Sequence, residues 1–332
     1  MKDTAETIAP RIQPLPTWHQ RTWRYVRVMF PPAVNVPFTF LGFYVFYLLL
    51  EAHAGLTRGG FGHPTGLPFG LSSLIGAITL VGFSLLMRIF DEFKDFHLDQ
   101  RLFPDRPLPS GQVLPRDLKI LGWGLAIGMT ALNALLGWAF LGFALLMAFG
   151  LLTYKWFFLE DLHRKNLLFT LSTHQPAVLF AHLYSFGVFL ETNGLRPTPP
   201  GLAVWAYVVM LWMPLLAWEV SRKIRVPEAE NDYVTYSMIL GPRRAALLPF
   251  LALSLSTAIG EYTCMSLRLP VWTMAALAGN YAIVVVAYTR WFWRPTPAAS
   301  RLRPIAEGFG LALYLLLVIA LLVTFGVRTL TP

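Results

Sequence analysis

Long apolar stretches alternate with short polar connections along nearly the whole chain. A membrane-spanning helix needs about 20 mostly apolar residues, and the stretches that approach this length are 36–50, 67–86, 118–136, 138–158, 167–189, 202–218, 245–263, 271–288 and 309–327. An odd number of spans places the two ends of the chain on opposite sides of a membrane. The pattern predicts an all-α polytopic membrane protein, a single bundle of about nine helices that forms one domain over residues 1–332.

The composition supports the same class of protein. Hydrophobic residues make up 55% of the chain, charged residues make up 14%, and the mean hydropathy is +0.53. In soluble domains the charged residues alone approach about a quarter of the chain. Cys264 is the single cysteine, so the sequence excludes a disulfide framework and a cysteine metal site.

Lysines and arginines concentrate in alternate connections. All 27 lie on the N-terminal side of the predicted bundle except Arg58, Arg196, Arg268 and Arg328. Because short cytoplasmic connections carry the Lys and Arg excess, we expect the N-terminus on the cytoplasmic side and the C-terminus on the opposite side. The net charge of +9 then faces anionic lipid headgroups, so it does not indicate a nucleic-acid partner.

The segment before the first apolar stretch mixes aromatic and basic residues. Trp18, Trp23 and Tyr25 alternate with Arg21 and Arg24. This mixture is typical of a helix that lies in the membrane interface. We therefore expect residues 1–30 to form a cytoplasmic interfacial segment.

An acidic row follows the second apolar stretch without a break, in the segment RIFDEFKDFHLDQRLFPDRPLPSG at 88–111. At about 100° per residue, Glu92, Asp95 and Asp99 fall within roughly 60° of one another on a helix, and Asp91, Asp95 and Asp99 are spaced four apart. Carboxylates stacked in this way repel one another. A hard divalent cation, which takes oxygen ligands and keeps waters or phosphate oxygens in its remaining positions, would explain them; a solvated helix end is the alternative. The row marks all four acids as candidate metal ligands.

The same residues carry a family resemblance. DEFKDFHLD with RPLPSG downstream resembles the first aspartate-rich motif of the UbiA-type intramembrane prenyltransferases, written NDxxDxxxD and followed by RPLPSG. On that match Asp91 stands where the family has Asn, and Glu92, Asp95 and Asp99 stand where it has Asp. The resemblance implies a central cavity open to the cytoplasmic side, Mg²⁺ as the cofactor, these acids as catalytic metal ligands, and Arg106 as a substrate contact.

A second charged run, WEVSRKIRVPEAENDYVTYSMILG at 218–241, ends the sixth apolar stretch on the same predicted side. The family has a second motif of the DxxxD kind there, whose acids hold a second magnesium. In this chain Glu219 is acidic, as the family motif requires, whereas Arg222 and Lys223 stand where the family has acids. Either these two cations hold diphosphate oxygens directly, or they anchor a helix end to headgroups. In the second case the rest of the site would fall to Glu228, Glu230 and Asp232.

Further candidates lie in or beside other apolar stretches. The fourth stretch ends TYKWFFLEDLHRKN, which resembles the family's site tyrosine followed by a basic pair. Tyr154 is then a lining residue or an ordinary interfacial aromatic, and Arg164 and Lys165 are anion contacts. Asn35 either lines the mouth of the bundle or caps its helix. His174 either orients or deprotonates an acceptor or makes an interhelical hydrogen bond.

These patterns and the resemblance predict a membrane-bound transferase that binds a prenyl diphosphate and Mg²⁺. Loss of the diphosphate would give an allylic cation, which a lipophilic or aromatic acceptor would capture. Two alternatives stay open. One is a terpene cyclase of the same superfamily that acts on a prenyl diphosphate alone, and the other is a transporter or lipid-binding protein in which the acidic row is an ion site.

Overall fold

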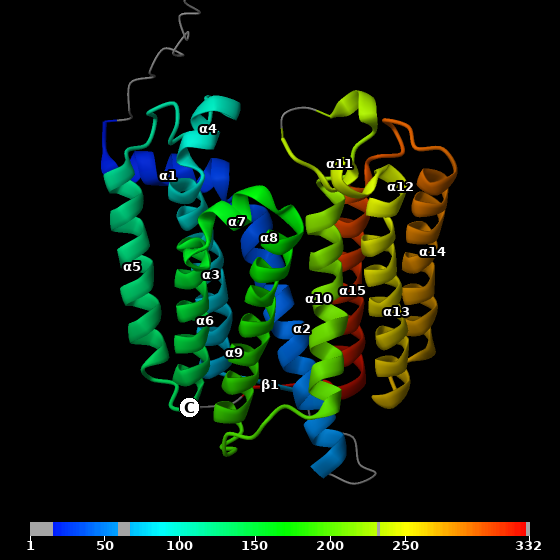
Figure 1. Cartoon of the computed structure of the whole chain (residues 1–332). Coiled ribbons are helices and arrows are strands. Elements are labelled where there is room, and N and C mark those ends of the chain that lie inside the picture. Colours follow the sequence, from blue (N-terminus) through cyan, green and yellow to red (C-terminus); the bar gives the residue numbers. More distant parts are fainter. Residues whose placement is uncertain (1–15, 59–66, 231–232, 330–332) are drawn as a thin grey trace, which may run out of the picture.

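The computed structural model describes residues 16–58, 67–230 and 233–329. Within these ranges the ordered structure is almost entirely helical, as the all-α prediction requires (Figure 1). Residues 1–15 of the predicted interfacial segment, residues 59–66 of the first outer connection, and Asp232 lie outside the described residues.

The helices and strands follow one another in this order: α1 (Trp18–Met29), α2 (Pro32–Arg58), β1 (Leu67–Phe69), α3 (Leu71–Lys94), α4 (Phe96–Leu102), α5 (Pro115–Asn133), α6 (Ala139–Tyr154), the 3-10 turn η1 (Trp156–Phe158), α7 (Glu160–Lys165), α8 (Leu167–His174), α9 (Pro176–Thr192), α10 (Leu202–Ser221), the 3-10 turn η2 (Pro227–Ala229), α11 (Tyr236–Leu240), α12 (Pro242–Ala245), α13 (Leu247–Ser266), α14 (Val271–Trp293), α15 (Leu302–Phe325) and β2 (Val327–Thr329).

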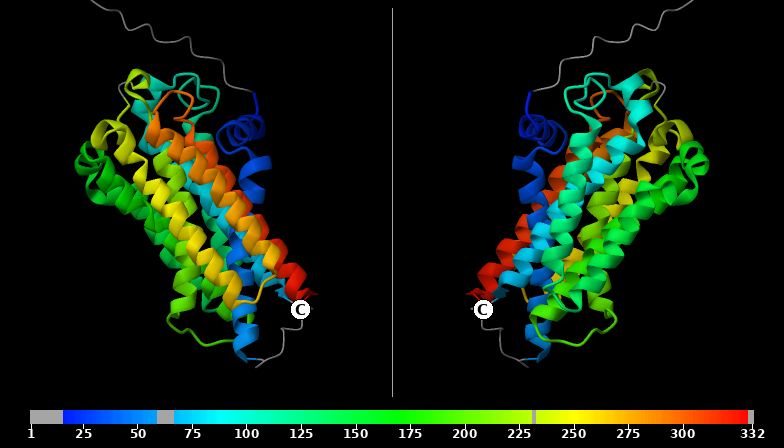
Figure 2. Two further views of the ribbon diagram at one scale, coloured as in Figure 1. Left: turned by 90° about the vertical axis from the view of Figure 1, so that its right-hand side faces the viewer. Right: turned by 90° about the vertical axis from the view of Figure 1, so that its left-hand side faces the viewer.

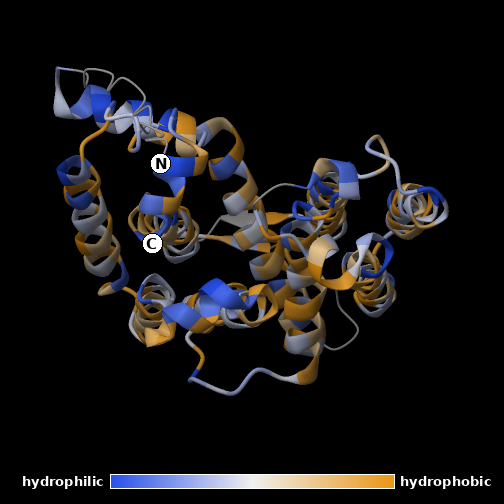
Figure 3. Ribbon diagram, turned by 45° about the horizontal axis from the view of Figure 1, so that its top comes forward, coloured by the Kyte–Doolittle hydropathy of each residue, from blue (hydrophilic) through white to orange (hydrophobic). Residues whose placement is uncertain are grey.

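The long helices run side by side in two groups (Figures 1 and 2). Helices α2, α3, α5, α6 and α9 pack together in the first group, and α10, α13, α14 and α15 in the second. The groups meet where α2 contacts α15 and where α9 contacts α10. Figure 3, turned so that the top comes forward, shows the helices arranged around a central region. One continuous apolar core links both groups.

Each predicted apolar stretch overlaps a helix, although the helices differ in length. By length and composition, six spans of the described part can cross a membrane: 32–57, 71–94, 202–221, 242–266, 271–293 and 302–325. Helix α6 is apolar but shorter. The fifth stretch is divided between α8 and α9, because Pro176 lacks the N–H that a helix interior needs and begins a new helix. The number nine stays a prediction.

The two short strands show where the bundle ends. Strand β1, which precedes α3, pairs in parallel with β2, which follows α15. The end of α15 therefore lies at the same end of the bundle as the beginning of α3. Helices α1, α4, α7, α11 and α12 lie at the opposite end (Figure 1), which we call the polar end. The beginning and the end of the described chain thus lie at opposite ends of the bundle.

Helix α1 lies across the polar end, as expected of an interfacial helix, and an ion pair fixes it there. Arg21 Nε donates to Asp117 Oδ2 at 2.6 Å, and Arg21 Nη2 donates to Oδ1 at 3.0 Å. The Leu114 N–H also donates to Asp117, at 3.0 Å. Burial by itself would raise the pKa of Asp117, but the Arg21 guanidinium and the Leu114 amide outweigh it and hold that pKa below its usual range. The pair therefore ties α1 to the start of α5.

Polar residues inside the bundle connect helices. The Tyr184 hydroxyl donates to Asn133 Oδ1 at 2.6 Å, and Asn133 Nδ2 donates to Thr79 Oγ1 at 2.8 Å. These bonds join α9, α5 and α3. His182 Nδ1 lies 2.7 Å from the Val178 carbonyl of its own helix. Each of these four side chains thus has the partner that its depth in an apolar bundle requires.

Candidate functional site

The acidic row lies at the polar end of α3, where the helix passes into α4. Asp95 separates the two helices, yet the backbone hydrogen bonds continue across it. The Asp95 N–H donates to the Asp91 carbonyl at 2.9 Å, and the Asp99 N–H donates to the Asp95 carbonyl at 2.8 Å. Residues four apart on such a path are neighbours. The four-spaced row inferred from the sequence is therefore present.

Two acids of the row are held by arginines. Glu92 is 1% exposed and pairs with Arg88, the i,i+4 partner one turn earlier. Its second oxygen, Oε2, is buried and has no hydrogen-bond partner among the described residues. Asp99 Oδ2 accepts a hydrogen bond from Arg106 Nη1 at 2.6 Å. The arginine of the RPLPSG segment therefore lies beside the acidic row, where the resemblance placed a substrate contact.

Asp95, in the middle of the row, makes no ion pair with any described residue. Burial raises the pKa of Asp95, and the charge of Asp91 raises it further, while Lys94 and Arg164 lower it. The opposing charge of Arg164 comes from α7, so α7 faces this part of the row. A bound cation would therefore stabilise the Asp95 carboxylate.

Lys94 connects the row to another part of the chain. Its side chain is 5% exposed, and Nζ lies 3.5 Å from Asp91 Oδ1. Nζ also lies 4.1 Å from the centroid of the Trp156 ring and 3.2 Å from His174 Nε2. A buried ammonium group needs such partners, because an unpaired charge is costly in a low dielectric. Lys94 therefore joins the end of α3 to η1 and α8.

The turn η1 has an unusual backbone. Trp156, Phe157 and Phe158 have φ values of 51°, 51° and 61°, all in the left-handed region. This conformation costs roughly 1–2 kcal/mol for each residue with a side chain, and contacts with the neighbouring rings hold it. Phe157 stacks on His163 with ring centroids 5.8 Å apart, and the Trp156 ring centroid lies 5.9 Å from that of His174. Strain of this kind gathers at functional sites.

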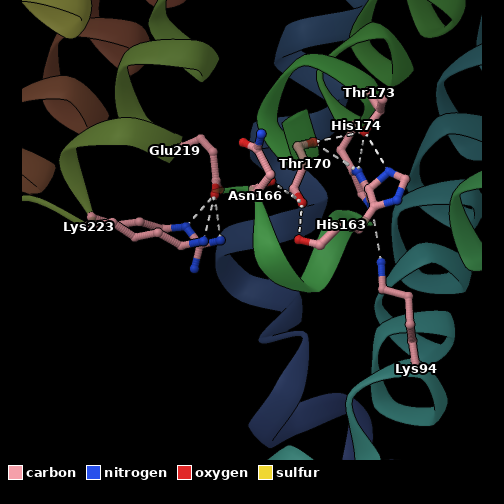
Figure 4. A network of polar contacts seen from close by, with 9 residues as sticks. Lys94, His163, Asn166, Thr170, Thr173, His174, Glu219 and Lys223 are labelled. Carbon is pink, nitrogen blue, oxygen red and sulfur yellow. Dashed lines mark hydrogen bonds and ion pairs between the residues drawn. The ribbon is translucent and has the colours of Figure 1, made fainter. Parts of the chain in front are cut away.

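Two histidines follow this turn and share a threonine (Figure 4). His163 Nε2 lies 2.9 Å from Thr173 Oγ1, and the same oxygen lies 3.2 Å from His174 Nδ1. The Thr170 hydroxyl donates to the His163 carbonyl at 2.9 Å. The network links α7 with α8 and, through Lys94, with α3. His174 therefore does make an interhelical contact, and its partner is a lysine.

The end of α10 carries the second charged group. Arg222 donates from Nε and Nη2 to the two carboxylate oxygens of Glu219, at 2.6 and 2.7 Å, and Lys223 Nζ lies 3.7 Å from Glu219 Oε1. Figure 4 shows Glu219 and Lys223 across from the α7–α8 network, and the charge of Lys223 acts on His174. Both cations are engaged by the acid of their own helix, and both charged clusters border one region of the polar end.

The other predicted residues take different positions. Tyr154 stacks on Phe90 of α3 with ring centroids 4.6 Å apart, which places it beside the start of the acidic row, because Phe90 directly precedes Asp91. Arg164 pairs with Glu160 at 2.7 Å, and Lys165 is exposed.

Asn35 is not the cap of its helix: it lies inside α2 and its Nδ2 donates to the Pro31 carbonyl at 3.0 Å. Nothing in the described part brings Asn35 to the acids.

Glu228, Glu230 and Asp232, the alternative site acids after α10, lie in the connection between α10 and α11. Glu228 is exposed, and Glu230 Oε1 accepts a hydrogen bond from the Thr235 hydroxyl at 2.8 Å. Asp232 lies outside the described residues. Glu230 thus bonds within the local loop through Oε1, while its Oε2 is buried without a hydrogen-bond partner among the described residues, and Glu219 lies with the cations at the end of α10.

The carboxylates offer only oxygen donors, the ligands that Mg²⁺ prefers. Among residues 16–58, 67–230 and 233–329, no three Asp, Glu, His or Cys side chains converge closely enough to hold a metal ion by themselves. Mg²⁺ commonly keeps several waters and binds through one or two carboxylates plus substrate phosphates. The orphaned Oε2 of Glu92 and the unpaired Asp95 therefore fit a Mg²⁺ that binds together with a diphosphate, and they do not form a complete metal cage.

Sequence reasoning missed several members of this site, namely Lys94, Trp156, His163, Thr170 and Thr173. Lys94 stands inside the acidic motif, three residues after Asp91, so its pairing with that acid had a local signal. The other four meet it only because the chain reverses at η1. The run Lys-Trp-Phe-Phe contains no Gly, Pro or Asn to indicate a turn.

Comparisons with known proteins agree with the geometry. The model of the UbiA prenyltransferase family matches residues 52–309. A structure described as digeranylgeranylglyceryl phosphate synthase in membranes has a TM-score of 0.60 and 13% identity, covering 91% of this chain and 99% of that chain. An apo structure of a UbiA homolog from Aeropyrum pernix K1 has a TM-score of 0.62 and 16% identity, covering 86% and 97%. A comparison with curated proteins finds no match.

Proposed function

The chain belongs to the UbiA prenyltransferase family, and on that basis we propose that it transfers a prenyl group from a prenyl diphosphate to a lipophilic acceptor in the membrane, with Mg²⁺. The observation that carries this proposal is Asp95, an unpaired carboxylate within an acidic row at the end of a membrane helix, on which the charge of Arg164 from α7 also acts. The proposal places this site on the cytoplasmic side, because the basic connections lie at the polar end.

The diphosphate would bind at the polar end of α3. Glu92 Oε2, Asp95 and Asp99 would hold Mg²⁺ together with diphosphate oxygens, with Asp91 at the edge of the row. When bound, the metal supplies Lewis-acid withdrawal of charge from the leaving diphosphate. Arg106 lies beside Asp99 and would donate to the same anion, since a guanidinium matches phosphate geometry.

Cations on the facing helices would stabilise the released diphosphate. Arg164 already exerts its charge on Asp95, and Lys165 follows it on α7. Arg222 and Lys223 on the α10 side would turn from Glu219 toward the anion, in place of the acids that hold a second metal in the family. Such charge-assisted contacts stabilise charge that develops in the transition state.

The prenyl cation would meet aromatic faces and then an acceptor. Tyr154 and Phe90 stack at the foot of the row, and aromatic faces attract a cation. His174 is proposed to help orient the acceptor, because both of its ring nitrogens are already engaged, by Lys94 and by the Thr170 carbonyl. The lipophilic acceptor is supported by the similarity to the structure described as digeranylgeranylglyceryl phosphate synthase.

One experiment separates this function from its alternatives. The purified chain in lipid nanodiscs is incubated with prenyl diphosphates of several chain lengths, Mg²⁺ and a lipid extract as acceptor, and diphosphate release and product mass are measured. We expect diphosphate release and a product heavier than the prenyl group by the mass of an acceptor. A cyclic hydrocarbon or alcohol formed without an acceptor would indicate the cyclase, and no diphosphate release with any chain length would indicate a transporter or lipid-binding protein.

A further inference from the structure

A pocket lies between α14 and α15, away from the acidic row. Its volume is about 560 Å³, within the range of small-molecule sites. Ala282, Ile283, Val286 and Ala287 of α14 form one wall, and the opposite wall and roof come from Ala298, Ala299, Leu302 and Ile305. No lining residue belongs to α3, α7, α8 or α10, so the pocket is separate from the proposed active site.

Two arginines, Arg290 and Arg301, complete the lining. Both are exposed, and neither makes an ion pair with a described residue; Arg303, which does not line the pocket, pairs with Glu307. None of the lining residues is acidic. The pocket therefore combines an apolar body with two free positive charges.

The position of the pocket identifies the environment that it faces. Helix α14 is the least buried of the long apolar spans, with 22% of its apolar window inside the protein. It lies at the right-hand edge of the bundle in Figure 1, and the left view of Figure 2 shows it beside α15. Arg290 lies in the last turn of α14 and Arg301 directly precedes α15, so both lie at the polar end. The apolar walls continue from there along helices that face the lipid.

We propose that this pocket binds one anionic glycerophospholipid, with its phosphate between Arg290 and Arg301 and the start of one acyl chain against Val286, Leu302 and Ile305. Basic pockets between transmembrane helices are suited to anionic headgroups, and the guanidinium fork matches phosphate oxygens. A prenyl diphosphate is a poorer match, because the pocket has no carboxylate to hold its metal. The lipid would fix α14 to α15 at the loop between them.

The test uses the full chain purified with phosphatidylglycerol or with phosphatidylcholine of the same acyl chains, and native mass spectrometry measures the lipid that is retained. We expect one phosphatidylglycerol per chain, retained in preference to phosphatidylcholine. Each positive charge near a lipid surface contributes about 1 kcal/mol, so Arg290→Ala or Arg301→Ala should lower this preference about fivefold and the double variant about thirtyfold. Arg294→Ala, in the same connection but outside the lining, should keep it.

A second variant tests the apolar part with both arginines present. Ala287→Phe should fill the pocket and also lose phosphatidylglycerol. Equal retention of the two lipids by the parent chain, or an unchanged preference in the double arginine variant, would overturn the proposal. Displacement of the lipid by inorganic phosphate or diphosphate at millimolar concentration would also overturn it, because the pocket would then be a site for free anions. These readouts do not depend on prenyl transfer.

Discussion

The Nζ atom of Lys94 lies 3.2 Å from Nε2 of His174, 80 residues further along the chain. His174 Nδ1 lies 3.0 Å from the Thr170 carbonyl, so Nδ1 carries the proton and Nε2 accepts from the Lys94 ammonium group. The same ammonium group lies beside Asp91. This contact thus holds the α8 segment against the acidic row.

We predict that Lys94 and His174 act as one unit. Lys94→Met and His174→Leu should each lower turnover about tenfold, because the α7–α8 segment loses its position against the row. The double variant should be no slower than the slower single variant, which corresponds to a coupling of roughly 0.5–3 kcal/mol. His97→Ala, an exposed histidine on α4, is the control. Strictly additive losses in a double-mutant cycle would show that the two residues act independently.

In the second charged cluster, we predict that substitutions of Glu219 and Arg222 change the affinity for diphosphate in opposite directions. If Arg222 holds diphosphate, Glu219 competes for it, so Glu219→Gln should tighten metal-free diphosphate binding about tenfold, or by about 1.4 kcal/mol. Arg222→Ala should weaken binding tenfold or more, since a charge-assisted contact contributes roughly 1.5–3 kcal/mol. Titration calorimetry measures both, with the exposed Arg244→Ala as the control.

Two other outcomes would contradict a role for Arg222 and Lys223 in holding diphosphate. Glu219→Gln would weaken diphosphate binding, and only in the presence of Mg²⁺, if Glu219 held a second metal as the family's acids do. An unchanged affinity in both Arg222→Ala and Lys223→Ala would make these residues headgroup anchors.

The membrane orientation is predicted from the basic connections. In a Cys264→Ser background, Asp105→Cys at the polar end should react with an impermeant maleimide only after the cells are opened. Arg196→Cys, in the connection before α10, should react in intact cells. Both residues are exposed and Cys264 is buried. A difference in labelling between the two variants therefore reports the side of the membrane on which each residue lies, and not its burial. Labelling of Asp105→Cys from outside would reverse the topology.

The ion pair between Arg21 and Asp117 predicts a dependence of stability on pH. The folded state holds the pKa of Asp117 below its usual value, which is about 3.9. The stabilisation is therefore present above the unfolded-state pKa and is lost as the pH falls through the folded-state pKa. Asp117→Asn should lower the thermal midpoint at pH 7 by several degrees and flatten its fall below pH 5. Asp161→Asn, exposed on α7, should melt like the parent; a match between Asp117→Asn and the parent would contradict the prediction.

Local patterns could be predicted from the sequence, and contacts between distant segments could not. The row at Asp91, Asp95 and Asp99 and the Arg88–Glu92 pair depend only on helical spacing, and both are present. The contact of Lys94 with His174 depends on the left-handed turn at η1, whose residues give no turn signal. Asn35 shows a local limit, because the helix begins at Pro32 and the asparagine is already inside it.

The positions of the helices could be predicted from the sequence, whereas their lengths could not. Apolar composition indicated where the long helices lie, whereas the break before Pro176 divides the fifth stretch and α6 is shorter than a typical span. The odd number of predicted spans predicted opposite placement of the chain ends, and within the described part α1 and β2 lie at opposite ends of the bundle. The pocket between α14 and α15 had no sequence signal, because its two arginines are separated by a loop whose path was unknown.

The central claim is that Asp95 helps to hold the metal and diphosphate whose departure starts prenyl transfer. The most direct measurement is Mg²⁺-dependent release of diphosphate from a prenyl diphosphate by the parent chain, by Asp95→Asn, and by Asp105→Asn, an exposed acid outside the row. We predict release by the parent that EDTA abolishes, a loss of at least a hundredfold in folded Asp95→Asn, and parental activity in Asp105→Asn. Parental release by Asp95→Asn, or by the parent chain in EDTA, would contradict the account.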